Sequence, residues 1–397
     1  MRNLAVNEIK RGIYWVGAID WDIRKFHGPS YHTQKGTSYN AYLIIDEKIT
    51  LVDIVDAHFV DEMIDNIKEI VDPSKIDYVV VNHIEPDHSG GFPKLMKYIP
   101  EAKVFCSKNG KEGMIKHYFG DYNYEIVKTG DEISLGSKTI RFIEAPMLHW
   151  PDSMFSYVPE EKLLMPNDAF GQHLASSKLF DDENDLCEVI DEAKKYYANI
   201  LMPFSPLVVK KIEEIVKMGL EVDMIAPSHG IIWRSHPSKI FEAYMGWGKG
   251  ETKRKAVVAY DTMWHSTEKM ARAIVEGLVS EGVDARLYKI SETDVNDIMT
   301  ETLEAKAILV ASSTINNTMI PHVAYFLEEL SGLKPKKKIG ASFGSYGWGK
   351  GAVANIEKKL KEAGVELIKE GLQIQYVPTA QDLANCFEYG KEIGKQI

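Results

Sequence analysis

The chain has 397 residues, of which 45% are hydrophobic, and it carries a formal net charge of −11. This length exceeds one ordinary domain and supplies apolar side chains for two hydrophobic cores, so we expect two domains. The acidic charge argues against a nucleic-acid partner, because binding phosphates requires a basic face. The one dense basic run, Lys334 to Lys338, is interpreted as a solvated turn before a strand.

The N-terminus and the cysteines indicate the compartment. Residues 1–8 lack the apolar segment of a signal peptide, and no stretch approaches the length of a membrane span. Cys106, Cys187 and Cys386 are far apart and form no CxxC pair. We therefore expect a cytoplasmic protein with reduced thiols, no membrane association and no iron–sulfur or rubredoxin module. Any electrons that it uses must then come from another protein.

Strands and helices alternate irregularly in the first part of the chain. Strands are predicted within residues 12–16, 39–46 and 49–55, and helices from about residues 57 and 110. This mixture is consistent with an αββα sandwich. A glycine-rich and charged segment near residue 250 then precedes a new buried strand. We expect the domain boundary there, with domains at residues 1–250 and 251–397.

Histidines and carboxylates follow several short apolar runs of the first domain. A buried strand at 77–82 is predicted to lead into a turn at 83–91, and the later members also come just after strands. Taken alone, each is more often a cap or a satisfied polar residue than a ligand. Together they are more than one cation could use, and they predict a dinuclear metal site. The series is His83, Glu85, Asp87, His88, His149, Asp168 and His229.

From residue 256 onward, strands and helices alternate regularly. Strands are predicted at 256–260, 285–290, 307–311, 339–343 and 366–372, with helices at 267–280, 294–303, 323–330 and 352–363. This order predicts a doubly wound parallel sheet. Such a sheet binds ligands at the carboxyl ends of its strands.

The loop after the first of these strands offers hydroxyls and the free N–H groups of a helix start, which suit a phosphate dianion. A Ser–Thr pair before a helix is, taken alone, usually an N-cap. The loop resembles the flavodoxin phosphate loop S/T-x-T-G-x-T: Thr262, Ser266 and Thr267 match its hydroxyls, whereas Trp264 and His265 depart from it. This resemblance implies FMN as the ligand.

The third and fourth strand loops correspond to those with which a flavodoxin holds its isoalloxazine ring. Tyr346 and Trp348 have glycines on either side, which let a flat ring approach the backbone, although they could also simply fill a hydrophobic cleft. The predicted FMN contacts are Thr262, Met263, Trp264, His265, Ser266, Thr267, Thr314, Ile315, Asn316, Asn317, Ser345, Tyr346, Gly347, Trp348 and Gly349.

The HxExDH cluster resembles the HxHxDH motif of metallo-β-lactamase-like hydrolases, with Glu85 in place of a histidine. A carboxylate there favours iron over zinc and redox chemistry over hydrolysis. Over essentially its whole length the chain resembles the flavodiiron proteins, also called A-type flavoproteins, including residues 145–154, 166–171 and 226–233. The implied α/β fold is an N-terminal metallo-β-lactamase-like αββα sandwich followed by a flavodoxin-like doubly wound parallel sheet.

The resemblance also implies residue roles. His83, Glu85 and His149 would hold one iron ion, Asp87, His88 and His229 would hold the other, and Asp168 would bridge them. His27 and Tyr197 would be donors near the open face of the site, or else ordinary packing residues.

Flavodiiron proteins reduce dioxygen to water or nitric oxide to nitrous oxide at a diiron site that FMN refills, and the ligand set does not discriminate between the two gases. Without a rubredoxin or flavin-reductase extension, the chain resembles the minimal two-domain class. The implied donor is an external rubredoxin or a deazaflavin coenzyme, and the implied active unit is a head-to-tail homodimer.

Two other functions remain as alternatives. A binuclear hydrolase of the thioesterase or lactonase type would use the same N-terminal fold. Glu85 and the flavin domain argue against it. A plain electron carrier would need only the second domain, so it would leave the ligand series unexplained.

Overall fold

The structure is a computed structural model that describes residues 7–26, 30–120 and 122–397. Contacts within the chain divide it into two compact units. The first unit comprises Met1–Tyr196 and Pro206–Met245, and the second comprises Tyr197–Ser205 and Gly246–Ile397.

Two packed sheets form the centre of the first unit. The seven-stranded sheet has the order β1-β2-β7-β8-β9-β10-β11. Its strands are β1 (Asn7–Lys10), β2 (Ile13–Trp15), β7 (Tyr42–Ile44), β8 (Thr50–Val52), β9 (Tyr78–Val81), β10 (Lys103–Cys106) and β11 (Tyr124–Ile126). The five-stranded sheet contains, in order, β12 (Glu132–Ser134), β13 (Thr139–Glu144), β14 (Met154–Val158), β15 (Leu163–Met165) and β16 (Met224–Ile225).

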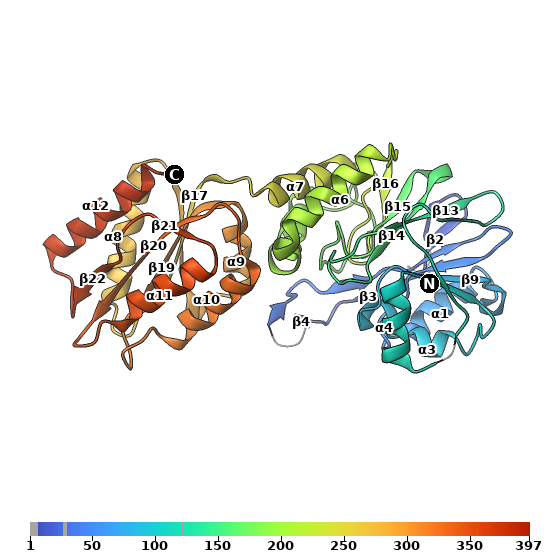
Figure 1. The fold of residues 1–397 in the computed structure, drawn as a ribbon, viewed down its shortest axis with the longest axis horizontal. Coiled ribbons are helices and arrows are strands. Elements are labelled where there is room, and N and C mark those ends of the chain that lie inside the picture. Colours follow the sequence, from blue (N-terminus) through green and yellow to red (C-terminus); the bar gives the residue numbers. More distant parts are fainter. Residues whose placement is uncertain (1–6, 27–29, 121) are drawn as a thin grey trace. The chain divides into compact units, whose positions relative to one another are not determined.

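The inner faces of these sheets share one core, in which Trp15, Val80 and Phe105 of one sheet pack with Phe142 and Met165 of the other. Figure 1 shows α1, α3 and α4 on one side of this unit and α6 and α7 on the other. The αββα sandwich is thereby confirmed. Its helices are α1 (Val60–Lys68), α2 (Pro86–Ser89), α3 (Phe92–Leu95), α4 (Lys108–Tyr118), α5 (Leu186–Tyr196), α6 (Ser205–Lys217) and α7 (Pro237–Lys249).

Short elements complete the first unit. Two small hairpins pair β3 (Ala18–Asp20) with β6 (Thr37–Tyr39), and β4 (Lys25–Phe26) with β5 (Tyr31–His32). The segment after β9, expected to be a turn, contains the one-turn helix α2. Pro86 occupies its first position, where the fixed φ of proline favours a helix start and the missing N–H costs nothing.

The second unit is built on a parallel sheet of order β18-β17-β19-β20-β21, with β22 also paired to β20. Figure 1 shows α8 and α12 on one face of this sheet and α10 and α11 on the other, which confirms the doubly wound fold. The strands are β17 (Lys253–Asp261), β18 (Asp284–Lys289), β19 (Ala305–Ser312), β20 (Ile339–Tyr346), β21 (Glu366–Leu367) and β22 (Leu372–Gln375). The helices are α8 (Ser266–Ser280), α9 (Val295–Glu304), α10 (Pro321–Leu333), α11 (Gly351–Glu362) and α12 (Ala380–Gly394).

The last predicted strand, at 366–372, is interrupted in the structure. The N–H of Gly371 donates to a carboxylate oxygen of Glu357 at 2.9 Å and so leaves the strand ladder. A Cβ at this glycine would lie 2.2 Å from Val353 Cγ1, so the close packing there requires glycine. The result is two short strands, β21 and β22, on the same edge of β20.

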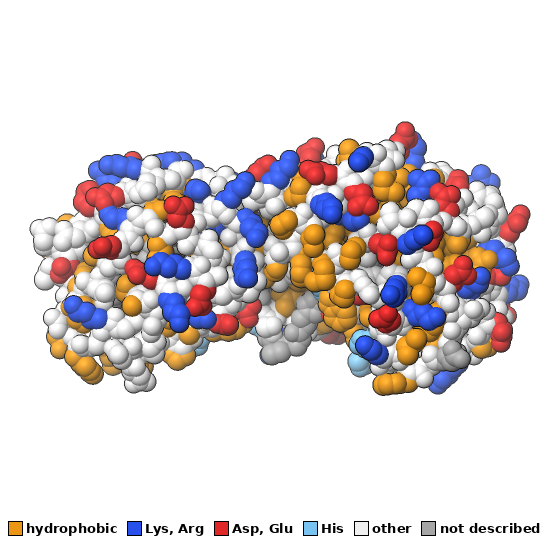
Figure 2. All heavy atoms as spheres, viewed as in Figure 1, with side chains coloured by type: hydrophobic (Ala, Val, Ile, Leu, Met, Phe, Trp, Pro, Cys, Tyr) orange, Lys and Arg blue, Asp and Glu red, His pale blue; other side chains and the backbone are white. Residues whose placement is uncertain are grey.

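The basic run at residues 334–338 is only partly solvated, which corrects the prediction. Lys338 is 3% exposed, and its Nζ donates to the carbonyl oxygens of Leu303 and Ala305. Burial lowers the pKa of Lys338 to about 7. Elsewhere, Figure 2 shows acidic and basic side chains interspersed over the visible face. Among the described residues, no helix is both long enough and apolar enough to span a bilayer.

Candidate metal centre and cofactor cavity

The seven predicted ligands lie in four segments of the first unit, each just beyond a strand. His83 and Glu85 follow β9, and Asp87 and His88 lie on the short helix α2 that comes next. His149 belongs to the connection between β13 and β14, and the peptide bond before it is cis. Asp168 follows β15, and His229 follows β16. The sandwich therefore brings residues far apart in sequence to the strand ends of both sheets.

Four of these residues form a first group: His83, Glu85, His149 and Asp168. Glu85 Oε2 lies 3.3 Å from His83 Nε2 and 3.2 Å from His149 Nε2. His149 Nε2 also lies 3.2 Å from Asp168 Oδ2. Ligand atoms that share one cation at about 2 Å lie about 3 Å from one another, so this group has the spacing of a single metal position.

Asp87, His88 and His229 form a second group. Asp87 Oδ2 lies 3.0 Å from the Nε2 atoms of both histidines. Asp168 also reaches this group, because its Oδ1 lies 2.8 Å from His88 Nε2 and 3.6 Å from His229 Nε2. The two oxygens of Asp168 thus face different groups, which is the arrangement of a carboxylate that bridges two cations. All seven predicted ligands come together.

The cluster contains buried polar atoms that make no hydrogen bond among the described residues. These atoms include both carboxylate oxygens of Asp87, both ring nitrogens of His88 and Oδ2 of Asp168. Burying such groups without partners is costly, and cations at the two positions would satisfy them. Three carboxylates among the seven ligands make a hard, anionic donor set, which fits two iron ions.

The charged groups of the cluster shift one another's pKa values. Burial disfavours a charge on His88, but the carboxylates of Asp87 and Asp168 outweigh this effect and raise the pKa of His88 to about 9. Burial alone would raise the pKa of Asp168, whereas His88 and His149 hold it well below its usual value. The imidazoles and carboxylates therefore compensate one another, and a metal ion must displace protons from the site to bind.

Aromatic rings enclose the ligands. The ring of Trp150 lies 5.2 Å from that of His83, and the rings of Phe26 and Tyr39 lie 5.5 and 5.9 Å from that of His229. These rings exclude water from the imidazoles and lower the local dielectric constant, which strengthens every charge interaction in the cluster.

Sequence reasoning missed two buried residues beside His229. The ring of His173 lies 4.7 Å from that of His229, and its Nδ1 lies 2.8 Å from Thr37 Oγ1. Tyr196 contacts the same pair, with its ring 5.2 Å from His173 and 6.3 Å from His229. The one sequence signal for His173 was its place in the loop that follows Asp168.

Of the two predicted donors near the open face, the structure describes Tyr197. Tyr197 belongs to the second unit, where its OH donates to Ser205 Oγ at 3.0 Å and its ring lies 5.3 Å from that of Trp247. Tyr196 is the last residue of α5, whereas Tyr197 begins a π-helical segment, Tyr197–Leu201. The contacts of Tyr197 agree with the alternative of ordinary packing, and its role as a donor stays a prediction. His27 lies outside the described residues.

The second unit contains a cavity of about 360 Å³ at the carboxyl ends of β17, β19 and β20. Beside it is a cavity of about 230 Å³ that shares Thr314, Gly347 and Trp348 with the first. Of the predicted FMN contacts, those that line these cavities are Met263, Trp264, Ser266, Thr314, Asn316, Asn317, Ser345, Tyr346, Gly347, Trp348 and Gly349. Ser313, Tyr376 and Val377 line the larger cavity and were not predicted.

The remaining predicted contacts lie next to the cavities. Thr262 Oγ1 is buried and makes no hydrogen bond among the described residues, so it can still donate to a ligand. His265, in the left-handed conformation at φ 64°, precedes α8 and bonds to Glu268. Ile315 pairs with Thr318 in a small turn. Asn316 and Asn317, just after it, are also left-handed, at φ 48° and 58°.

Three hydroxyls form a triangle, and two of them, on Ser313 and Ser345, belong to residues that line the larger cavity. Thr267 Oγ1 lies 3.0 Å from Ser313 Oγ and 2.9 Å from Ser345 Oγ, and the two serine oxygens are 3.1 Å apart. The triangle ties together the loops that follow β17, β19 and the end of β20. Trp264 and Trp348, which line the same cavity, are 81% and 93% exposed. Hydroxyls and uncovered aromatic surface fit the phosphate and the flat ring of FMN.

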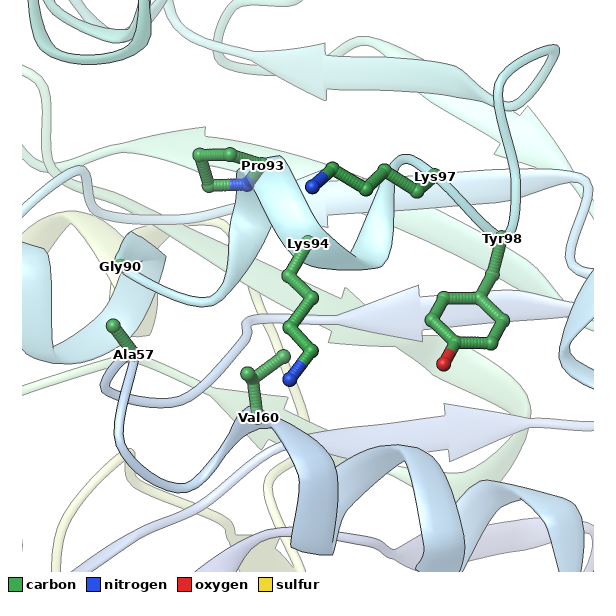
Figure 3. Close-up of a pocket in the computed structure, with 7 residues that line it drawn as sticks. All are labelled: Ala57, Val60, Gly90, Pro93, Lys94, Lys97 and Tyr98. Atoms are coloured by element: carbon green, nitrogen blue, oxygen red, sulfur yellow. The ribbon is translucent and has the colours of Figure 1, made fainter.

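Another cavity, of about 460 Å³, lies between α1 and α3 in the first unit (Figure 3). Lys94 extends across it toward α1 and bonds to Asp61 at 2.6 Å, while Tyr98 borders the opposite side. None of the seven metal ligands lines this cavity. It is therefore separate from the metal centre.

Comparison with known families gives a match for each unit. The family model "ODP family beta lactamase" matches residues 37–230, and the "Flavodoxin" model matches residues 258–390. The first match contains all seven metal-ligand candidates, and the second contains all predicted FMN contacts.

Whole-chain comparisons agree. A protein of Moorella thermoacetica named nitric oxide reductase is 56% identical, over 98% of both chains. The solved rubredoxin oxygen:oxidoreductase of Desulfovibrio gigas is 38% identical, with a TM-score of 0.96 over 98% of both chains. The flavodiiron protein of Giardia intestinalis is 35% identical, with a TM-score of 0.96 over 100% of this chain and 97% of that one. The chain described here therefore belongs to the flavodiiron protein family.

Proposed function

We propose that the chain is an oxidoreductase that reduces nitric oxide to nitrous oxide, dioxygen to water, or both, at a non-haem diiron site that FMN supplies with electrons. The observation that carries this proposal is the pair of buried ligand groups that share Asp168. Relatives named as nitric oxide reductase and rubredoxin oxygen:oxidoreductase support it. Hydrolysis is disfavoured, because Glu85 takes the place of a hydrolase histidine and a flavodoxin domain follows.

In this proposal, residues 1–250 form the diiron domain and residues 251–397 the FMN domain. His83, Glu85 and His149 would hold one iron, Asp87, His88 and His229 would hold the other, and Asp168 would contribute to both positions. The spacing within each group supports this division.

When bound, two adjacent iron ions would supply two electrons at once, and FMN would supply the electrons that restore them. The side chains of the protein position the metal ions and keep water away from them. Glu85, Asp87 and Asp168 balance the positive charge of the metals, and the rings of Phe26, Tyr39 and Trp150 keep water from the imidazoles. His173 and Tyr196 add polar groups beside His229.

The proposal includes an external electron donor, such as rubredoxin or a deazaflavin coenzyme. It also includes a cytoplasmic location, which three free cysteines support. The active unit is a head-to-tail homodimer. Domains of these lengths have radii of gyration of roughly 18 and 15 Å, so two sites on one chain can be too far apart for direct electron transfer. A two-fold dimer can place each flavin beside the partner's metal centre.

The test is consumption of each gas by protein loaded with iron and FMN, with chemically reduced rubredoxin as the donor. We expect rapid consumption of nitric oxide, dioxygen or both, and none without FMN. Protein that consumes neither gas but hydrolyses thioesters when loaded with zinc would refute the proposal in favour of the hydrolase.

A further inference from the structure

The carboxylate of Asp152 lies directly behind the ligand His83. Its Oδ2 is 2.9 Å from Nδ1 of His83, and the same oxygen accepts the backbone N–H of Ile84 at 2.8 Å. Asp152 is 2% exposed, and its backbone carbonyl accepts a hydrogen bond from Ser107 Oγ at 2.7 Å. Asp152 belongs to neither ligand group. It is therefore a fixed, buried carboxylate one step removed from the metal positions.

This contact determines which nitrogen of His83 faces the metal position. An ionised carboxylate only accepts hydrogen bonds, so Nδ1 of His83 is the donor to Asp152. Nε2 then directs its lone pair at the first group, where it lies 3.3 Å from Glu85 Oε2 and 3.5 Å from Asp168 Oδ2. A carboxylate behind an imidazole also increases its basicity as a ligand.

The second group has weaker support of this kind. Nδ1 of its ligand His229 lies 2.8 Å from the carbonyl oxygen of Ser38, which carries no net charge. Nδ1 of His88 makes no hydrogen bond among the described residues. His83 is therefore polarised more strongly than His88 or His229.

Building on the proposed dinuclear site, we propose that Asp152 is a positioning residue that, through His83, makes the first group the tighter of the two cation positions. The group concerned is His83, Glu85, His149 and Asp168. Loss of the Asp152 charge therefore weakens one cation position and spares the other.

The full chain allows a matched pair of variants. Asp152→Asn removes the charge but keeps an oxygen that can accept the hydrogen bonds from His83 and Ile84. Asp152→Ala removes the charge and the two hydrogen bonds. Asp181 provides the control. It is also buried, at 1% exposure, and accepts hydrogen bonds from the N–H of Arg234 and from the N–H and Nδ1 of His236, a histidine outside the cluster. Asp181→Asn thus disturbs a similar arrangement that includes none of the ligands.

The protein is first treated with a chelator that removes metal ions but leaves the flavin in place. It is then titrated with cobalt(II), and visible absorption measures the uptake of the ion. Wild type and Asp181→Asn should each take up two ions, one more tightly than the other, and each step should have the same affinity in both proteins. In Asp152→Asn, the tighter step should weaken by roughly tenfold, and in Asp152→Ala by up to about 100-fold, while the weaker step changes little. A purely structural role would lower thermal stability or weaken both steps alike.

Wild-type affinity for both ions in both Asp152 variants would overturn this inference and leave the proposed function standing. Equal weakening of the two steps would also overturn it. Uptake of fewer than two ions by the wild type would instead remove the dinuclear site, and with it both the proposed function and this inference.

Discussion

The two candidate sites of this chain are built in opposite ways. In the first unit, seven charged or polar ligands are each 9% exposed or less, and they point at one another. In the second unit, the cavity is open, and Trp264 and Trp348 on its rim are 81% and 93% exposed. One site buries carboxylates and imidazoles together, and the other leaves apolar surface uncovered.

Each arrangement indicates what completes it. Buried carboxylates and imidazoles are stabilised by cations, whereas exposed aromatic surface is stabilised by a flat apolar ligand that covers it. Because the two sites depend on different interactions and lie in different units, a substitution in one should leave ligand binding in the other intact. The predictions below test this independence.

The largest effect is expected from Asp168→Ala. The substitution removes a ligand from both groups, so iron content should fall sharply and gas reduction should drop by roughly 100-fold or more. FMN content should stay at the wild-type level. Iron analysis and flavin absorbance of the same sample measure both sites. Asp191→Ala, which removes an exposed carboxylate of α5, is the control, and full iron content in Asp168→Ala would contradict the bridging role.

The converse experiment is the double substitution Ser266→Ala and Thr267→Ala. It deletes two hydroxyls at the predicted phosphate site, so FMN affinity should fall by roughly tenfold or more, with iron content unchanged. Fluorescence titration of the flavin-free protein measures the affinity. Ser280→Ala with Ser331→Ala removes two hydroxyls elsewhere in the second unit. If FMN affinity stays the same in the first double variant, the phosphate binds at another place.

Mixing the two defective chains tests whether the sites cooperate across a dimer. Asp168→Ala protomers and protomers lacking the phosphate-loop hydroxyls are refolded together. Random pairing makes about half of the dimers heterodimers. In each heterodimer, one of the two pairs of FMN site and partner metal site is intact, so about a quarter of wild-type activity should return. If heterodimers form without any recovery of activity, electrons pass within one chain.

The metal centre should also respond to pH. The pKa of His88 is raised from 6.5 to about 9 in the folded protein. Protonated His88 therefore stabilises the folded, metal-free protein. This stabilisation is fully present below about pH 6.5 and is lost as pH rises through about 9. Metal-free protein should lose thermal stability over this interval, while its affinity for iron rises because fewer protons compete. His88→Asn should flatten both trends.

The smallest effect separates two neighbouring tyrosines. Tyr196→Phe, beside His229, should slow gas reduction by a few-fold at most. Tyr197→Phe should leave activity unchanged and lower the free energy of unfolding by about 1 kcal/mol, because it loses the hydrogen bond to Ser205. Steady-state rates and denaturant unfolding of both variants distinguish them. The opposite pattern would support a role for Tyr197 at the active site.

The features that could be predicted from the sequence are those that depend on a local pattern of apolar and polar residues. The metal ligands were recognisable because each follows a short apolar strand, and strand ends of a layered fold meet at one edge. The parallel sheet was recognisable because its strands and helices alternate regularly. Eleven of the predicted FMN contacts line the cavities for the same reason, since their loops follow parallel strands.

What the sequence did not reveal depends on long-range packing. Asp152 is 69 residues from His83, and only the pairing of the two sheets brings them together. Tyr196 and Tyr197 are neighbours in the sequence, but one ends α5 and the other begins a π-helical segment. In the sequence, nothing distinguishes Ser313 from other serines in loops, because its contacts with Thr267 and Ser345 join segments that are far apart along the chain. The last helix, α12, was missed, although Thr379 and Asp382 form a capping box at its start.

The left-handed residues around the flavin cavity have a further consequence. His265, Asn316 and Asn317 hold positive φ values. Such a conformation costs an ordinary residue roughly 1–2 kcal/mol and is less costly for asparagine, so the surrounding sheet must sustain it. The cofactor then meets loops that are already preorganised, and little conformational entropy is lost on binding. Protein stripped of its flavin should rebind FMN without refolding.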